Sequence, residues 1–284
     1  MTYRWLMGAA AAASIVAGAV AAQAADLPTK KEAPAPVFVP PPFTWTGFYV
    51  GLNAGGIWGS SGTTTTVYAN GFPIATANGV GTLASVFPGG GIGSGEGGFI
   101  GGGQAGYNWQ TGAFVLGIET DFDGTSLSRS RNLIGPTFID PIFGLNDFLT
   151  KSATVRLDWL GSTRARVGFV ATPDNRLMFY GTGGFAYGGA SAHLNVWDAV
   201  DGFYWQSGNR SNTRTGWTLG AGVEYAWTNN WTIGAEYLYY NLGSRHLTTV
   251  PNLAASNFFG AAIFSDTKVN FDGSVIRARV NYKF

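Results

Sequence analysis

The sequence of 284 residues has no cysteine, little charge and one long apolar stretch, at its N-terminus. Without cysteine the fold cannot depend on disulfides, which form in oxidising compartments. Charged residues make up 12% of the chain, against roughly 25% in ordinary soluble domains. A membrane-spanning helix needs about 20 consecutive apolar residues. Nothing after the N-terminal stretch meets that requirement, so a bundle of membrane helices is excluded.

Glycine and aromatic residues are abundant. There are 43 glycines, and aromatic residues account for 15% of the chain. Together with the low charge, this composition indicates strands that face lipid on one side. The formal net charge is +1, which argues against nucleic acid as a partner because such partners require many basic residues.

The N-terminal region predicts export from the cytoplasm. Residues 1–25 have the features of a secretory signal peptide, with cleavage near Ala24 in an A-x-A site. The alternative, a membrane anchor, is disfavoured because the stretch is rich in alanine and Asp26 follows at once. Residues 26–43 are rich in proline, which predicts an extended periplasmic tail. Residues 44–284 then form one domain.

From Trp45 onward, apolar residues alternate with small or polar ones, the period-two pattern of a strand with two unlike faces. Eight such strands are predicted, at about residues 47–58, 98–110, 113–123, 153–170, 176–188, 213–227, 231–241 and 269–284. Short turns are expected near residues 111–112, 173–175 and 229–230. Long irregular loops are expected at residues 59–97, 124–152, 189–212 and 242–268.

Alternating short and long connections are typical of outer-membrane barrels, with short periplasmic turns and longer extracellular loops. The predicted fold is therefore all-β: an eight-stranded antiparallel transmembrane β-barrel in the cell outer membrane. A soluble β-sandwich is the alternative. It is disfavoured because its water-facing surface would carry very few charges, and because aromatic residues recur at strand ends, where interfacial girdles lie. These aromatic residues are Phe48, Trp58, Trp109, Trp159, Phe169, Trp217, Trp227, Trp231, Tyr282 and Phe284.

Eight charged residues fall on the faces with small side chains, at similar depth. They are Glu119, Asp121, Arg164, Arg166, Glu224, Glu236, Arg277 and Arg279. A basic residue facing lipid at the bilayer midplane costs roughly 2–4 kcal/mol, so all eight are expected inside the barrel. Eight strands enclose space for side chains only. This favours a structural network of ion pairs, and a selectivity constriction or a proton path is the alternative.

Several motifs that suggest chemistry have simpler explanations. The G-x-G-x-x-G motif at 101–106 is followed by strand alternation rather than by the helix a dinucleotide site needs. Asp123 could contribute to calcium binding at the barrel rim. His193 and His246 fall in predicted extracellular loops and are candidate ligand contacts, but two histidines without cysteine do not form a usual zinc site. No catalytic constellation, metal site or cofactor site is evident, so an enzyme is not expected.

Four segments resemble the alphaproteobacterial outer-membrane immunogenic protein family. They are Phe43–Gly51 (FTWTGFYVG), Asp158–Gly168 (DWLGSTRARVG), Tyr180–Gly188 (YGTGGFAYG) and Arg277–Phe284 (RARVNYKF). The members of this family are small porin-like surface antigens of brucellae, bartonellae and rhizobia. The resemblance implies an abundant barrel that supports envelope integrity and contacts the host or the environment through its loops. Haemin binding and a porin role are reported for some members.

Three functions are consistent with the sequence: a structural and surface-interaction barrel, a small-solute channel, and a haem or ligand receptor. The charged residues favour the first. The expected partners are outer-membrane lipid and lipopolysaccharide, the outer-membrane assembly machinery, and a host or environmental ligand at the loops. The outward residues Val280, Tyr282 and Phe284 resemble the C-terminal signal read by that machinery.

Overall fold

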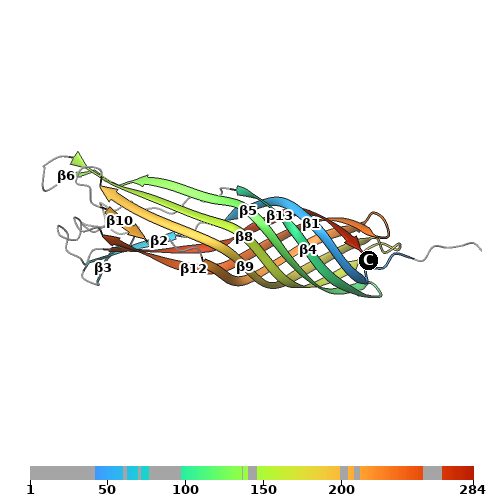
Figure 1. The fold of residues 1–284 in the computed structure, drawn as a ribbon. Coiled ribbons are helices and arrows are strands. Elements are labelled where there is room, and N and C mark those ends of the chain that lie inside the picture. Colours follow the sequence, from blue (N-terminus) through green and yellow to red (C-terminus); the bar gives the residue numbers. More distant parts are fainter. Residues whose placement is uncertain are drawn as a thin grey trace, which may run out of the picture. The chain divides into compact units, whose positions relative to one another are not determined.

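The computed structural model describes residues 42–59, 63–69, 72–76, 97–135, 137–139, 146–198, 204–207, 212–251 and 264–284. Eight long strands form a closed antiparallel ring (Figure 1). They are β1 (Gly47–Gly59), β4 (Gly97–Thr111), β5 (Phe114–Ile134), β8 (Leu149–Val170), β9 (Leu177–Asp198), β11 (Asn212–Ala226), β12 (Trp231–Pro251) and β13 (Phe264–Lys283). The last strand, β13, pairs with both β12 and β1 and so closes the ring. The predicted eight-stranded barrel is confirmed.

Five short strands accompany the ring. They are β2 (Thr63–Ala69), β3 (Phe72–Thr76), β6 (Phe138–Ile139), β7 (Asn146–Asp147) and β10 (Tyr204–Ser207). Strand β2 pairs with β13 and β3, β10 pairs with β9 and β12, and β6 pairs with β7. All five lie where irregular loops were expected. Strands β5, β9 and β12 also run about ten residues further than predicted. The expectation of long irregular loops is therefore wrong for most of the described parts of these segments.

The tight turns at the opposite end of the barrel agree with the prediction. Gly112 and Asn175 adopt left-handed backbone conformations, with φ of 60° and 59°. Glycine reaches this region without steric cost, and asparagine tolerates it better than most residues do. The residues after Trp227 form the third short turn, which leads into β12.

Near these turns, the outward face of the barrel is apolar. On β5, Leu116 and Ile118 point outward and are more than half exposed, while Glu119 and Asp121 are buried on the inward face. We call this part of the barrel the apolar band. It comprises about residues 48–58, 99–109, 114–122, 159–169, 177–187, 217–225, 231–239 and 276–284.

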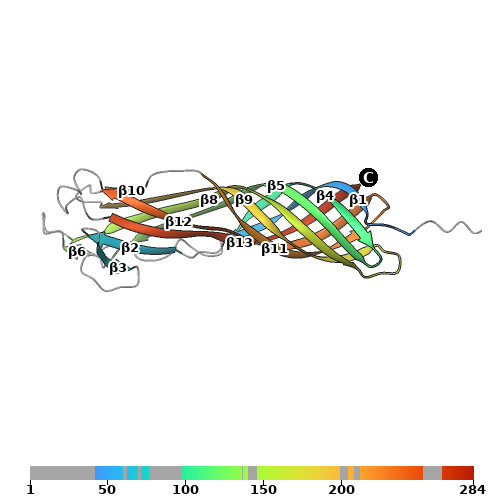
Figure 2. The same cartoon turned by 90° about the horizontal axis from the view of Figure 1, so that it is seen from below.

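Beyond the apolar band, the polarity of the two faces is inverted. On β5, Ser128 and Ser130 face outward and Leu127 is buried inside. We call this part the stem; it comprises about residues 127–134, 149–157, 189–198, 244–251 and 264–272 together with β2, β3 and β10. Figures 1 and 2 show the long strands continuing into it. Its interior is an apolar core that includes Val155, Leu194 and Phe271.

Register shifts accompany the inversion on two strands. In β8 the pairing register shifts between Leu157 and Trp159. Before this shift the inward residues have odd numbers, up to Leu157, and after it they have even numbers, from Leu160 onward. In β12 a shift between Asn241 and Ser244 lets Leu247 face inward. One extra residue moves every later side chain to the other face. On β12 the shift coincides with the predicted end of the strand at residue 241. On β8 the predicted strand, from about residue 153, already included the position of the shift.

Candidate functional site: the barrel lumen

Inside the apolar band, nine charged side chains form one buried group, which we call the charge cluster. Its members are Glu119, Asp121, Asp123, Arg164, Arg166, Glu224, Glu236, Arg277 and Arg279, each less than 5% exposed. They share the inward face because successive side chains of a strand point to opposite sides of the sheet. Since the outward side chains here are apolar, the lumen is the place where charge costs least.

Arg164 and Arg277 connect opposite walls of the lumen. Arg164, on β8, contacts Glu119 and Asp121 on β5, both at 2.7 Å, and Glu236 on β12 at 2.9 Å. Arg277, on β13, contacts Asp121 and Asp123, both at 2.6 Å, and Glu236 at 2.8 Å. Because β5 and β12 are not neighbouring strands, these contacts cross the interior rather than follow the wall.

The other two arginines lie beside tyrosine rings. The guanidinium of Arg166 is 3.7 Å from the ring centroid of Tyr180 and binds Glu224. Arg279 binds Glu119, and its Nη1 donates to the Tyr180 hydroxyl at 3.1 Å. The Tyr49 hydroxyl donates to Glu119 at 2.6 Å. Acidic, basic and hydroxyl groups therefore pair with one another across the lumen, although the Nε atoms of Arg164, Arg166 and Arg279 have no hydrogen-bond partner among the described residues.

The structure places all eight of the sequence-derived charged residues in this cluster and adds a ninth. Asp123 was considered for calcium at the rim, but its carboxylate is buried and binds Arg277 and the amide of Asn53 (2.8 Å). The placement at the rim is therefore wrong. The signal that could have identified Asp123 is its spacing of two residues from Asp121, which puts both on one face. Within the described residues, no group of three or more potential metal-binding side chains is found.

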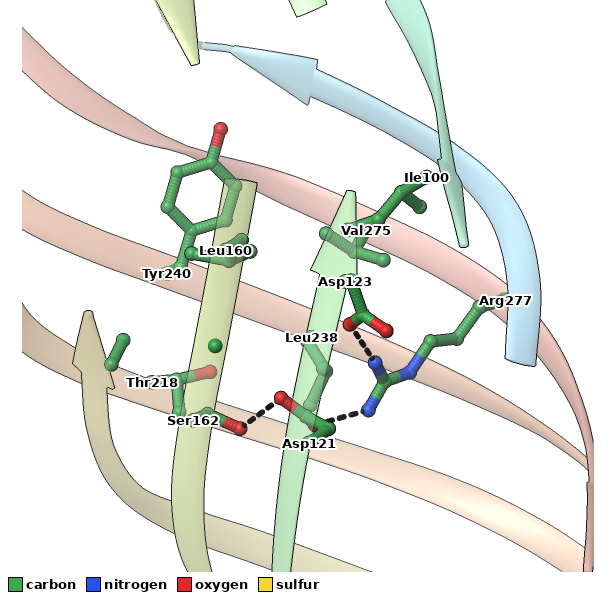
Figure 3. A pocket seen from close by; sticks show the side chains of 12 residues that line it. Ile100, Asp121, Asp123, Leu160, Ser162, Thr218, Leu238, Tyr240, Val275 and Arg277 are labelled. Carbon is green, nitrogen blue, oxygen red and sulfur yellow. Dashed lines mark hydrogen bonds and ion pairs between the residues drawn. The ribbon is translucent and has the colours of Figure 1, made fainter. Parts of the chain in front are cut away.

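A small cavity of about 10 Å³ separates the charge cluster from the apolar core. Figure 3 shows Asp121 and Asp123 joined to Arg277 by ion pairs at this cavity, which apolar side chains such as Leu160 and Val275 also line. A volume of this size holds about one water molecule. Beyond it, the core of the stem fills the lumen.

At the end of the barrel near the tight turns, the chain that precedes β1 closes the lumen. Trp45 is 1% exposed. Its backbone N–H donates to the Gln110 side chain, and its indole N–H donates to the carbonyl of Asn175, both at 2.8 Å. The ring of Phe43 packs edge-on against it at 5.0 Å. Phe43 therefore belongs to the barrel and not to an extended tail. The predicted signal peptide and residues 26–41 lie outside the described residues.

The two histidines are not in loops, as was predicted. His193 lies on β9 opposite Thr154, and His246 lies on β12 opposite Lys268. The Nδ1 of His246 is 2.7 Å from the carboxylate of Asp266. Both positions belong to the stem, whose strands extend through the segments that were expected to be irregular.

The glycine motif serves packing. A Cβ at Gly106 would lie 2.5 Å from the Tyr49 hydroxyl, and a Cβ at Gly102 would lie 2.5 Å from the Asp123 carboxylate. Real Cβ atoms do not approach other atoms so closely. These glycines thus leave room for the side chains of the charge cluster, and β4 continues as a strand through the motif.

Comparison with known proteins gives one family. A family model described as an outer membrane protein β-barrel domain matches residues 10–284. The 31 kDa outer-membrane immunogenic protein of Brucella melitensis is 39% identical over 268 residues, which cover 94% of this chain and 95% of that protein. The 25 kDa outer-membrane immunogenic protein of Brucella abortus is 28% identical over 255 residues, covering 88% of this chain and 84% of that protein. The resemblance inferred from the sequence motifs is confirmed, as is the outer-membrane location.

Solved structures give more distant similarities. The outer membrane protein OprG from Pseudomonas aeruginosa is 10% identical with a TM-score of 0.43, and the match covers 85% of this chain and 98% of OprG. The outer membrane protease OmpT from Escherichia coli is also 10% identical, with a TM-score of 0.40. That match covers 86% of this chain and 99% of OmpT.

Proposed function

The chain belongs to the family of outer membrane proteins with a β-barrel domain, and we propose that it is a closed, non-catalytic barrel that supports the envelope and carries surface loops on a rigid stem. The observation behind this proposal is the charge cluster. Arg164 and Arg277 cross the lumen and hold carboxylates of opposite walls. A solute path along the axis would have to break these buried ion pairs.

Two further features support a closed lumen. Trp45 and Phe43 pack into one end, and the apolar core of the stem fills the other side of the cluster. Ions do not cross an apolar core without a large desolvation cost. The aromatic residues at one end, the charge cluster and the apolar core of the stem would each obstruct conduction by a different physical means. A small-solute channel is therefore the second candidate function.

Single-channel recording in planar bilayers tests this proposal. The full-length mature protein is expected to give no stable openings, while a porin measured in the same bilayers gives its normal conductance. Trp45→Ala removes only the layer at the turn end, so this variant is expected to remain silent. Stable openings of the wild-type protein would show instead that it is a small-solute channel.

A role in the envelope is testable in cells. Deletion of the gene is expected to raise sensitivity to detergent, and expression of the wild-type chain is expected to restore resistance. Unchanged sensitivity after deletion would contradict the envelope role. A haem receptor built on His193 and His246 is not proposed, because His246 already binds Asp266 and His193 lies on another strand.

We also propose that the end of β13 acts as the assembly signal. Val280 and Phe284 face outward and are 44% and 68% exposed. The Phe284 ring packs against Phe48 and Tyr282, with centroids 5.8 and 5.1 Å apart. Deletion of Phe284 is expected to reduce the heat-modifiable protein found in the outer membrane. Phe185→Ala, which changes another exposed outward aromatic residue, is the control and is expected to assemble normally.

A further inference from the structure

The outward side chains of β5, β8 and β9 form one continuous surface on the stem. Strand β8 pairs with β5 on one side and with β9 on the other. Inward neighbours such as Val155 and Leu194 are buried in the core of the stem. The register aligns the outward side chains in rows across the three strands, for example Ser130, Thr154 and His193, and then Asn132, Ser152 and Asn195. We call this surface the hydroxyl face; it consists of the outward residues of 128–134, 150–156 and 191–197.

The hydroxyl face carries many hydrogen-bonding groups and little charge. Most of its side chains are serine, threonine or asparagine, and its only permanently charged member is Arg156, at the edge nearest the apolar band. The outward face of β12 and β13 differs, since it carries Asp266, Lys268 and Asp272. Surfaces that meet only water usually carry interspersed charges of both signs. The hydroxyl face therefore suits a neutral polar partner better than an ionic one.

The side chains of this face match the two kinds of group on a sugar ring. The hydroxyls of Ser130 and Thr154 lie 2.8 Å apart, and Trp197, opposite Thr150, lies partly exposed at the far end of the face. A sugar ring has hydroxyl groups around its edge and apolar C–H groups on its two faces. Hydroxyl and amide side chains donate to and accept from the former, and an aromatic ring packs against the latter. This combination is the chemistry that recognises a saccharide.

The height of the hydroxyl face above the hydrocarbon indicates the source of that saccharide. The Trp159 ring packs against those of Phe122 and Tyr187, with centroids 5.3 and 6.3 Å apart, and such aromatic residues mark the edge of the hydrocarbon. Towards its start, β8 continues from Trp159 to Thr150. At about 3.3 Å per residue and a tilt of about 35–45°, this segment rises about 20–25 Å.

Phospholipid headgroups fill only a small part of that height, since they extend about 5–8 Å beyond the hydrocarbon. Most of the hydroxyl face therefore lies at the level of what projects further from the same leaflet. In the outer leaflet of the outer membrane, that is the oligosaccharide of lipopolysaccharide. The face is also continuous with the lipid-facing surface of the same three strands, so a glycolipid beside the band has its sugars beside the face.

We propose that the hydroxyl face binds the oligosaccharide of lipopolysaccharide. Asn132, Ser152 and Asn195 form hydrogen bonds with sugar hydroxyls, and Trp197 packs against the C–H face of a sugar ring. In cells this binding would serve the envelope role and so rests on the proposed function. The binding itself takes place outside the barrel wall and does not depend on whether the lumen is closed.

The test measures binding of the core oligosaccharide, released from lipid A by mild acid, to the purified mature protein in detergent micelles. Saturation-transfer NMR detects the sugar protons that contact the protein, and a titration gives the dissociation constant. A value of about 1 mM or lower is expected, which suffices because the glycolipid is held beside the face at high local concentration. Absence of saturation transfer to the oligosaccharide would overturn the proposal.

Variants locate the binding surface. Asn132→Ala combined with Asn195→Ala is expected to weaken binding roughly tenfold because hydrogen bonds to the sugar are lost, and Trp197→Ala is expected to weaken it several-fold. Thr248→Ala changes an outward residue of β12 and is expected to leave binding unchanged. Heat-modifiable migration verifies folding, and the asparagine and tryptophan variants are independent, so either one decides if the other does not fold. Unchanged binding by a folded variant of the hydroxyl face would place the saccharide elsewhere.

Two further outcomes separate this proposal from its alternatives. A second copy of the chain could also cover a flat sheet face; a dimer in light scattering that dissociates in the double asparagine variant would overturn the saccharide as the occupant. A protein that binds no oligosaccharide but still protects cells against detergent would remove this proposal and leave the proposed function. Channel openings in a protein that binds the oligosaccharide would do the reverse.

Discussion

The apolar band and the stem are built from the same strands with opposite polarity. On β13, Ile276 faces outward and Arg277 inward within the band, whereas Lys268 faces outward and Val269 inward within the stem. The backbone alternation is the same in both regions. The two regions differ in what surrounds them, which is lipid around the band and water around the stem. The apolar residues therefore face outward in the band and inward in the stem.

The comparison shows how one barrel meets two environments. In the band, lipid accepts the apolar side chains, and the polar ones turn inward, where each charge must be paired. In the stem, the outward serine, threonine, asparagine and charged residues indicate water, and the apolar side chains form an ordinary core. The inversion therefore locates the outer boundary of the hydrocarbon near Trp159 and Tyr239. A rigid stem beyond this boundary would raise the loops above the headgroups.

The largest expected difference between the two regions concerns ion pairs. Glu236→Ala removes a buried carboxylate bound by Arg164, Arg277 and Arg279, and should lower the free energy of unfolding by about 3–5 kcal/mol because buried cations lose their partner. Asp266→Ala, in the exposed pair with His246, should cost less than about 1 kcal/mol. Urea unfolding in lipid vesicles measures both. Similar losses in the two variants would contradict a structural role for the charge cluster.

A charge on the outward face provides the next comparison. Ile118→Arg places a cation against lipid in the band, and should destabilise the barrel by about 2–4 kcal/mol. Ser128→Arg places the same charge on the same strand and face in the stem, where water surrounds it, and should change stability by about 0.5 kcal/mol or less. Folding titrations in vesicles report both values. A loss for Ser128→Arg as large as that for Ile118→Arg would mean that the stem also lies in lipid.

The last comparison is a pH dependence, which concerns the buried lysine of the stem. Burial lowers the pKa of Lys151 from 10.5 to about 8, and its amine donates to the Thr65 hydroxyl at 3.0 Å. Between these two pKa values the unfolded chain holds more protons than the folded one, so stability should rise with pH from about 8 to about 10.5. The slope should not exceed about 1.4 kcal/mol per pH unit.

Two substitutions isolate this effect. Lys151→Met removes the charge and should abolish the rise, with higher stability at pH 7 because no amine is desolvated. Lys268→Met removes an exposed lysine of the same region and should leave the rise unchanged. Unfolding curves measured from pH 7 to pH 10.5 decide the matter, and a rise that persists in Lys151→Met would assign it to another group.

The charge cluster could be predicted in large part because it depends on local rules. Alternation fixes which face carries Arg164 and Arg166, and the cost of charge in lipid requires that face to point inward. Partners across the lumen could not be predicted. The contact between Arg164 and Glu236 joins strands that are not neighbours, and its existence depends on the width of the closed ring.

The stem was missed for a related reason. Residues such as Leu127 and Leu194 alternate with polar neighbours as regularly as those of the band. A pattern of period two does not state which of its faces is outside, and on β12 the shift after Asn241 interrupts it. The same segments were therefore interpreted as loops, and His193 and His246 were placed in them.

The sequence by itself determined the class of fold, the number of spanning strands and the inward charges, because each follows from alternation and from the cost of polar groups in lipid. The tertiary structure alone decided two other things: how the charges pair across the lumen, and how Trp45 closes one end. These depend on distances between residues remote in the chain. Such distances are fixed only when β13 pairs with β1 and the ring closes.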